Sequence, residues 1–243
     1  MTLKWRGNIL SYNNNKTVKG EKDGFATYIF YGAPNTVSGY NTCASSSKGC
    51  RANCIFYSGM GAMKTVQNAR IRKTKLYFEE RDYFLTLVNK DIMSAIKHGE
   101  RNDMIPTFRL DGTTDIGLAR HFVRLYPNVQ FYDYTKVVKR VKMAEKYDNW
   151  HITYSLSENT TKSTMKILLA GTTNIAIPFK VVPNIGDRLW GRKLVDGYST
   201  DLRFLDGINR IVCLKAGGRG RKSDSEFIVP DVETLLDRFS MVA

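Results

Sequence analysis

The chain has 243 residues, of which 42% are hydrophobic, and its 37 lysine and arginine residues outnumber 23 acids to give a formal net charge of +14. This length and apolar content suffice for a buried core, and we expect one domain over 1–243. The lack of a long apolar run and of a secretory signal excludes a membrane-spanning or secreted protein, so we expect the cytoplasm and no membrane partner. The charge favours nucleic acid, DNA or RNA, as the partner, although excess charge can also serve solubility alone.

Strands are predicted from short β-branched or aromatic runs that begin after a polar N-terminal segment. Residues 1–24 are expected to form a short strand and then a polar loop, because 11–24 is rich in Asn, Lys and Gly. A C-terminal helix is expected within 230–243. The strands predicted for the core, 25–229, are ATYIFYG at 26–32, IPTFRL at 105–110, VQFYDY at 129–134, HITYSL at 151–156, NIAIPF at 174–179 and RIVCLK at 210–215.

Helices are predicted between these strands, where apolar residues recur at three- and four-residue steps. The clearest pattern spans 76–97, and others span 61–73, 115–125, 136–146 and 160–170. Strands that alternate with helices predict right-handed crossovers and a mostly parallel sheet. The expected fold class is therefore α/β, either an open parallel sheet with helical crossovers or a partial (β/α) barrel, and we prefer the barrel.

Polar residues follow several predicted strands, which is the reason for preferring the barrel. DGTTD occupies 111–115, DYTK occupies 133–136 and SLSEN occupies 155–159. In β/α folds the carboxyl ends of the parallel strands form one rim, and that rim carries the active site. The catalytic candidates that we expect at this rim are Asp111, Asp133, Glu158 and, later in the chain, Asp201.

Some of these acids have a simpler structural explanation. Asp115 fits the first turn of a helix, but helix capping leaves Asp111 unexplained. Arg109 lies close to Asp111 in the sequence and is a candidate ion-pair partner for it. Alternation along the strand places Asp133 and Tyr134 on opposite faces of the sheet, and we expect Asp133 to face the site.

Three cysteines follow the first core strand, in the segment TCASSSKGCRANC. Cys43, Cys50 and Cys54 are separated by six and then three residues, and the small residues between them let the chain wrap closely around a metal. We expect an iron–sulfur cluster, with 4Fe-4S favoured, because three thiolates leave one iron free to bind S-adenosylmethionine. Zinc with a fourth ligand and unligated thiols are the alternatives. Cys213 could be that fourth ligand, but a single cysteine in an apolar strand is more typically buried.

Basic residues are dense in three segments, where helix formers, aromatic residues or Gly accompany them. NARIRKTK covers 68–75, a basic run follows the tyrosines of 129–134, and GGRGRKSD covers 217–224. Cations beside aromatic rings suit phosphate contacts and base stacking. The residues that we expect to contact nucleic acid are Arg70, Arg72, Lys73, Lys136, Lys139, Arg140, Arg219 and Arg221.

Several motifs in combination carry a resemblance to a known family. They are the cysteine cluster with CIFYSG, the basic VQNARIRK, FRLDGTTDI, VQFYDYTK, YSLSEN and the late VDGYSTDLRFLD. Over 25–229 the chain resembles the phage-encoded gene product 88-like proteins. The resemblance implies a phage origin and a cluster-binding site, with no assigned biochemical role. Where we expect such proteins to carry an acid and a histidine, this chain has Tyr198, Ser199 and Thr200 before Asp201.

Three functions are compatible with these patterns. The first, favoured by the cysteines and rim acids, is a phage iron–sulfur protein that acts on nucleic acid or a nucleotide through S-adenosylmethionine radical chemistry. The second is a nonenzymatic protein with a structural metal site that binds single-stranded nucleic acid in phage replication. The third is an interaction protein that disables a host enzyme or defence system. The basic charge argues against mimicry of nucleic acid in that third case.

Overall fold

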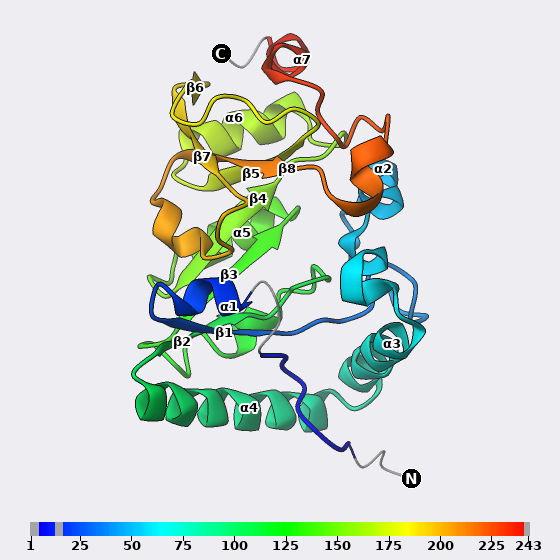
Figure 1. The fold of residues 1–243 in the computed structure, drawn as a ribbon, viewed down its shortest axis with the longest axis vertical. Coiled ribbons are helices and arrows are strands. Elements are labelled where there is room, and N and C mark those ends of the chain that lie inside the picture. Colours follow the sequence, from blue (N-terminus) through cyan, green and yellow to red (C-terminus); the bar gives the residue numbers. More distant parts are fainter. Residues whose placement is uncertain (1–4, 13–16, 241–243) are drawn as a thin grey trace.

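The computed structural model describes residues 5–12 and 17–240, and a mostly parallel sheet of eight strands lies at the centre of this part of the chain (Figure 1). The strand order is β1-β2-β3-β4-β5-β8-β7-β6, so the first five strands are neighbours in chain order. The sequence prediction of an α/β fold with a parallel sheet is confirmed. The six predicted strands are β1 (Phe25–Ile29), β2 (Ile105–Arg109), β3 (Gln130–Thr135), β4 (Trp150–Ser155), β5 (Asn174–Phe179) and β8 (Arg210–Lys215).

Two short strands that the sequence did not predict extend the sheet beyond β8. β7 (Arg192–Asp196) runs parallel to β8, and β6 (Arg188–Leu189) pairs antiparallel with β7. The turn between them contains Trp190 and Gly191, both with positive φ, of +51° and +73°. A strand of two residues is too short to show any alternation of apolar and polar residues.

Helices cover one face of the sheet, as strand–helix alternation requires. Phe108 and Phe131 on this face are fully buried and stack with ring centroids 5.5 Å apart. Val88 and Ile92 belong to the same apolar cluster, so the long helix packs directly on the strands. The helices on this face are α3 (Lys64–Glu79), α4 (Arg81–Asn102), α5 (Val138–Ala144) and α6 (Lys162–Ala170).

Two helix predictions differ from the structure. The continuous helix expected over 76–97 is interrupted at Glu80, where α3 ends and α4 begins in a new direction (Figure 1). The break lets Tyr77 and Phe84 pack edge to face, with centroids 5.3 Å apart. In the segment 115–125 the only regular element is the short η3 (Leu118–His121), because a buried carboxylate binds the backbone there, as described below.

The N-terminal segment is held by side chains rather than by a sheet. Among residues 5–12 the strand expected near the start is reduced to an isolated antiparallel bridge between Ser11 and Ile29. The carboxylate of Asp91 accepts the backbone N–H groups of Ile9 and Leu10 at 2.6 and 2.9 Å. Part of the predicted polar loop forms α1 (Thr17–Glu21), while residues 1–4 and 13–16 lie outside the described residues.

The opposite face of the sheet is covered by the connection from β7 to β8. Its 3-10 turn η4 (Arg203–Asp206) brings Phe204 against Phe25 and Tyr132, with ring centroids 5.2 and 5.4 Å apart. Arg203 in the same turn is fully buried and pairs with Asp206. This connection therefore fills the face of the sheet opposite the helices.

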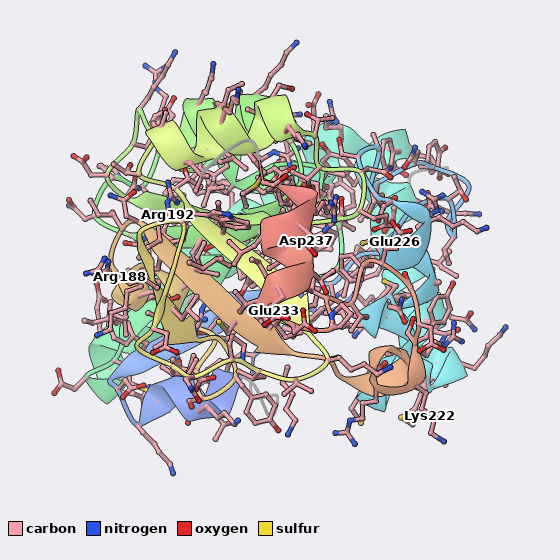
Figure 2. All side chains as sticks on the ribbon, turned by 90° about the horizontal axis from the view of Figure 1, so that it is seen from above. Arg188, Arg192, Lys222, Glu226, Glu233 and Asp237 are labelled. Carbon is pink, nitrogen blue, oxygen red and sulfur yellow. The ribbon has the colours of Figure 1, made fainter. Side chains whose placement is uncertain are left out.

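Arg192 of β7 joins the late strands to a helix (Figure 2). Its buried guanidinium donates to the carbonyl groups of Leu168 and Gly171 at the end of α6. Such side-chain donors satisfy carbonyls that a helix leaves unpaired. The predicted C-terminal helix is α7 (Val232–Arg238), and residues 241–243 lie outside the described residues. Within the described part of the chain, no helix combines the length and apolar character needed to cross a bilayer.

Candidate cysteine site at the carboxyl ends of the strands

The cysteine loop, residues 43–54, follows β1 and lies at the carboxyl-end rim of the sheet. Cys43 precedes the short helix α2 (Lys48–Ala52), Cys50 lies within it, and Cys54 precedes the 3-10 turn η1 (Ile55–Tyr57). All three side chains are free thiols and half-buried. Cys213 is different, because it is fully buried in the middle of β8.

The three thiols are close enough to influence one another electrostatically. Burial raises the pKa of Cys43, and Cys54 and Cys50 raise it further. Burial also raises the pKa of Cys54, with a further increase from Cys50, while Arg70 and Lys136 oppose it. Among the described residues, no three or more His, Cys, Asp or Glu side chains stand in a geometry that could hold a metal ion. Metal binding by these cysteines would therefore need their loop to draw the thiols together.

Glu158, which follows β4, anchors the cysteine loop. One carboxylate oxygen accepts the hydroxyl of Ser47 and the other accepts the backbone N–H of Gly49, both at 2.6 Å. Ser47 in turn caps α2 by accepting the N–H of Cys50 at 3.1 Å. Partial burial opposes ionisation of Glu158, but these hydrogen bonds hold its pKa below the ordinary value. The predicted rim acid thus positions the loop rather than facing solvent as a free base.

Gly49 shows how closely the loop approaches the rim. A Cβ atom at this position would collide with the hydroxyl of Ser225 and the carboxylate of Glu158. Sequence analysis had identified the small residues of this loop but neither Ser47 nor the need for glycine at position 49. The only local signal is the serine three residues before Cys50, which is the spacing of an N-cap.

Asp111 performs the capping role that the sequence had suggested for Asp115. Its carboxylate, only 3% exposed, accepts the hydroxyl of Thr114 at 2.6 Å and the N–H groups of Gly117 and Leu118. These bonds fold the 111–118 segment into a turn instead of the predicted helix. With its oxygens buried and hydrogen-bonded, Asp111 shapes the rim, and its catalytic role stays a prediction.

Asp115 instead connects two rim loops. Its carboxylate pairs with Arg140 and accepts the hydroxyl of Thr135 at 2.8 Å, while its backbone N–H donates to the carbonyl of Thr42. Thr42 immediately precedes Cys43, so Asp115 links the cysteine loop to the end of β3. Arg140, predicted to contact nucleic acid, is therefore engaged in an internal ion pair.

Asp133 lies on the helix-covered face, contrary to the expectation that it faces the site. It is 2% exposed, shares a strand face with Phe131, and accepts the N–H of Asp111 through Oδ1 at 2.7 Å. Burial and the neighbouring Asp111 raise the pKa of Asp133 well above its ordinary value. Among the described residues its Oδ2 has no hydrogen-bond partner. This side chain is a buried acid of the core, and Tyr134 points to the opposite face.

Asp201 pairs with Arg109, so the suggested pairing of Arg109 with Asp111 is wrong. The two charged groups meet at 2.7 Å, with side chains only 7% and 15% exposed. The guanidinium also lies 4.8 Å from the ring centroid of Tyr134. Burial opposes the charge on Arg109, but Asp201 raises its pKa overall. Asp201 therefore serves a buried ion pair that fastens the β7–β8 connection to β2.

The predicted nucleic-acid residues divide into buried and exposed groups. Lys73 donates to the carbonyl of Ile9, and burial lowers its pKa to about 8, so it holds the N-terminal segment. Arg70 and Lys136 lie at the rim beside Cys54 and are half-buried. The members that lie exposed are Arg72, Lys139, Arg219 and Arg221.

Arg219 brings the end of β8 to the same rim. It belongs to the 3-10 turn η5 (Gly218–Lys222), and its guanidinium stacks 4.3 Å from the ring centroid of Tyr57. A Cβ atom at Gly218 would collide with the hydroxyl of Ser58. Figure 1 accordingly shows this late turn, in orange, beside the cysteine loop around α2.

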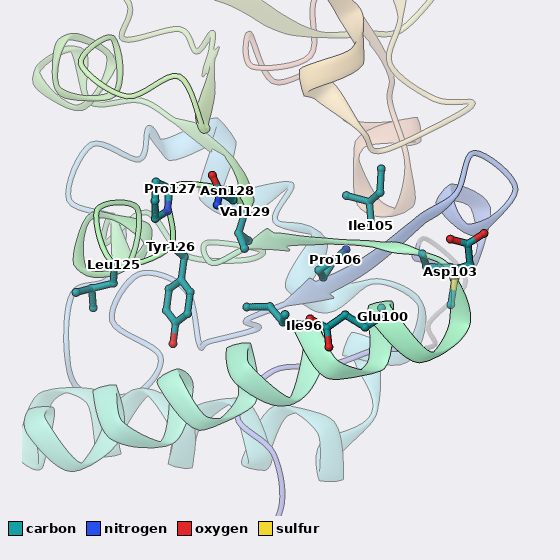
Figure 3. A pocket seen from close by; sticks show the side chains of 12 residues that line it. Ile96, Glu100, Asp103, Ile105, Pro106, Leu125, Tyr126, Pro127, Asn128 and Val129 are labelled. Carbon is teal, nitrogen blue, oxygen red and sulfur yellow. The ribbon is translucent and has the colours of Figure 1, made fainter.

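A pocket of about 530 Å³ lies elsewhere, at the amino ends of the strands (Figure 3). It is lined by the C-terminal half of α4, the start of β2 and residues 125–129, with Ile96, Ile105 and Tyr126 among its side chains. It contains none of the cysteines. In β/α folds this end of the sheet is associated with stability and the other end with chemistry, so the rim remains the candidate site.

Comparison with known proteins identifies a family. No curated protein and no solved structure matches the chain. The sequence profile described as Gene product 88 matches residues 8–230, which cover the cysteine loop, all the strands and η5. This agrees with the resemblance found over 25–229, and the chain belongs to the Gene product 88 family.

Proposed function

We propose that the protein is a phage iron–sulfur protein that acts on nucleic acid or a nucleotide in the host cytoplasm, with S-adenosylmethionine as its co-substrate. The observation that carries the proposal is the grouping of three mutually interacting thiols in the first β/α loop, at the carboxyl ends of parallel strands. Ligand sites in this fold class occur at that end of the sheet.

The chemistry of the three thiols supports a bound cation. Burial and mutual repulsion raise the pKa values of Cys43 and Cys54, so these thiols hold their protons when no cation is present. A bound metal reverses this preference because it stabilises thiolates. Small residues at 44–47 permit the adjustment that brings the sulfur atoms together. Cys43, Cys50 and Cys54 would hold a 4Fe-4S cluster, and such a cluster, once reduced by an external one-electron donor, would supply an electron to a bound small molecule.

The residues around the cysteines have roles in positioning. Glu158 and Ser47 fix α2, and Asp115 fixes the chain just before Cys43. Arg70 and Lys136 place positive charge beside Cys54, which stabilises its thiolate form. The loop is thus attached to the ends of β3 and β4, so its cysteines stay at the rim.

Anaerobic purification tests this proposal directly. We expect brown protein with a broad visible absorption and with iron and acid-labile sulfide in similar amounts. Zinc at one atom per chain with no iron would favour the structural site instead, and metal-free thiols under reducing, iron-supplemented conditions would refute metal binding altogether.

A second candidate, nonenzymatic binding of single-stranded nucleic acid, is favoured by the stack of Arg219 on Tyr57 at the rim. Exposed cations next to aromatic rings suit phosphates and bases respectively. Ile55, Met60 and Met63 are 50%, 68% and 50% exposed in the same stretch and add apolar surface for base stacking. This surface would hold nucleic acid whether or not the site is catalytic.

Salt dependence of oligonucleotide binding tests this surface. Replacing Lys139, Arg219 and Arg221 together with glutamine should reduce the slope of log affinity against log salt by about 2, because each phosphate contact contributes about 0.7 for single strands. The matched control replaces the exposed Lys90, Lys97 and Arg101 of α4 and should leave the slope unchanged. Equal effects of the two triple variants would show general attraction without an interface.

A further inference from the structure

Arg70 is a cation without a counter-ion. It extends from α3, and its guanidinium lies 4.8 and 5.4 Å from the ring centroids of Tyr31 and Phe56. Of the described acidic residues, none forms an ion pair with it. Its Nε and Nη1 atoms are buried and have no hydrogen-bond partner in the described part of the chain. A charged donor left in this state is unfavourable unless an acceptor arrives.

The packing around Arg70 holds the guanidinium in place beside Cys54. A Cβ atom at Gly61 would come within 3.0 Å of Nη1, so the chain approaches the side chain closely on one side. Nη2 makes no hydrogen bond with the described residues and, unlike Nε and Nη1, is not fully buried. An incoming acceptor therefore reaches the guanidinium at Nη2, on a side chain that the two rings have already positioned.

Lys136 supplies a second positive charge on the same rim, against different neighbours. Its Nζ donates to the hydroxyl of Ser155 at 2.6 Å and lies 5.2 Å from the ring centroid of Phe227. The acid that it influences is Glu158, whose two oxygens are already bound by the cysteine loop. Glu158 is thus a negatively charged neighbour of Lys136, whereas Arg70 pairs with none of the described acids.

We infer that the guanidinium of Arg70 forms a binding subsite for the anionic group, carboxylate or phosphate, of a small molecule that occupies the rim next to the turn after Cys54. A half-buried, ring-clamped guanidinium is prepared to form charge-assisted hydrogen bonds with such a group. A polynucleotide backbone would approach over the exposed residues instead. The inference rests on the proposed function for its choice of ligands, because an adenosine-containing substrate carries either a phosphate or an amino-acid carboxylate.

Calorimetric titration of the full chain, prepared anaerobically, tests the subsite with three probes. Adenosine 5′-monophosphate carries the phosphate, S-adenosylhomocysteine carries the carboxylate, and adenosine carries neither. At least one anionic probe should bind about tenfold or more tightly than adenosine, and Arg70→Gln should abolish that advantage. Lys75→Gln, on the exposed side of α3, is the matched control and should retain it.

Each outcome of these titrations either supports or contradicts the anion subsite. If only one anionic probe is preferred, the group that it carries, phosphate or carboxylate, is the one that the subsite binds. Preference for both probes indicates a general anion site. Arg70→Met, which keeps the apolar stem between the two rings, provides a second variant with the same expected loss in case Arg70→Gln does not fold. No preference over adenosine, or a preference that survives both substitutions, overturns the inference. Metal content is measured in the same samples, so absent iron with intact anion preference would contradict the proposed function and leave the subsite standing.

Discussion

Replacing Asp201 with asparagine is expected to lower the free energy of unfolding by about 3–5 kcal/mol, because it leaves the guanidinium of Arg109 buried without its counter-ion. The pair meets at 2.7 Å, and Arg109 is 7% exposed at its side chain, so water cannot replace the lost carboxylate. For a chain of this size the loss corresponds to a fall in Tm of roughly 10 °C. Chemical and thermal unfolding followed by circular dichroism measure both quantities.

The control for this experiment is a surface ion pair in the same protein. Lys180 and Asp224 meet at 3.1 Å, but their side chains are 47% and 92% exposed. Asp224→Asn should therefore change stability by less than about 1 kcal/mol. If the two variants lost similar amounts, burial of the Arg109 pair would not be what makes it important.

Alanine substitution of Cys43, Cys50 or Cys54 is expected to remove most of the bound metal in each case. A cluster held by three protein thiolates loses one of its ligands with each substitution, and the remaining thiols cannot replace that ligand. Cys213→Ala is the matched control, because this fourth cysteine is buried in β8 and should leave metal content unchanged. Iron, sulfide and zinc analysis of the four variants after identical anaerobic preparation provides the measurement.

The pattern among these variants separates the possible sites. Loss in three variants and retention in Cys213→Ala supports a site made by the cysteine loop alone. Loss in all four would make Cys213 a fourth ligand and would require β8 to rearrange around it. Retention of metal in any one of the loop variants would show that its cysteine is not a ligand and would reject the three-thiolate arrangement.

The strands could be predicted from the sequence because a strand that is buried on both faces is a continuous run of apolar residues. In β5 all six residues are buried, and the run NIAIPF is apolar enough to recognise without any partner. The helix break at Glu80 could not be predicted, because apolar residues keep their helical spacing through it. What decides the break is the packing of Tyr77 against Phe84, which depends on both helices being in place.

The site could be predicted only where its residues are neighbours in the sequence. The cysteines belong to one loop, so their grouping was visible, whereas the contact of Glu158 with Gly49 spans 109 residues. Arg109 shows the same limit, because the choice of Asp111 as its partner used sequence proximity while the structure selects Asp201. Arg70 was predicted to contact nucleic acid because of the basic run around it, whereas its place between two rings depends on residues from separate segments.

The contact of η5 with the turn after Cys54 has a consequence for biosynthesis. Gly218 of η5 lies against Ser58, so the turn that packs beside the cysteine loop is synthesised 160 residues after Ser58. Nearly the whole polypeptide must therefore leave the ribosome before η5 can pack against the turn after Cys54. Contacts between residues so far apart in the sequence form slowly. Loading of the thiols during translation would meet an open, unsupported loop. At the proposed metal site, delivery is consequently expected to follow completion of the chain rather than accompany its synthesis.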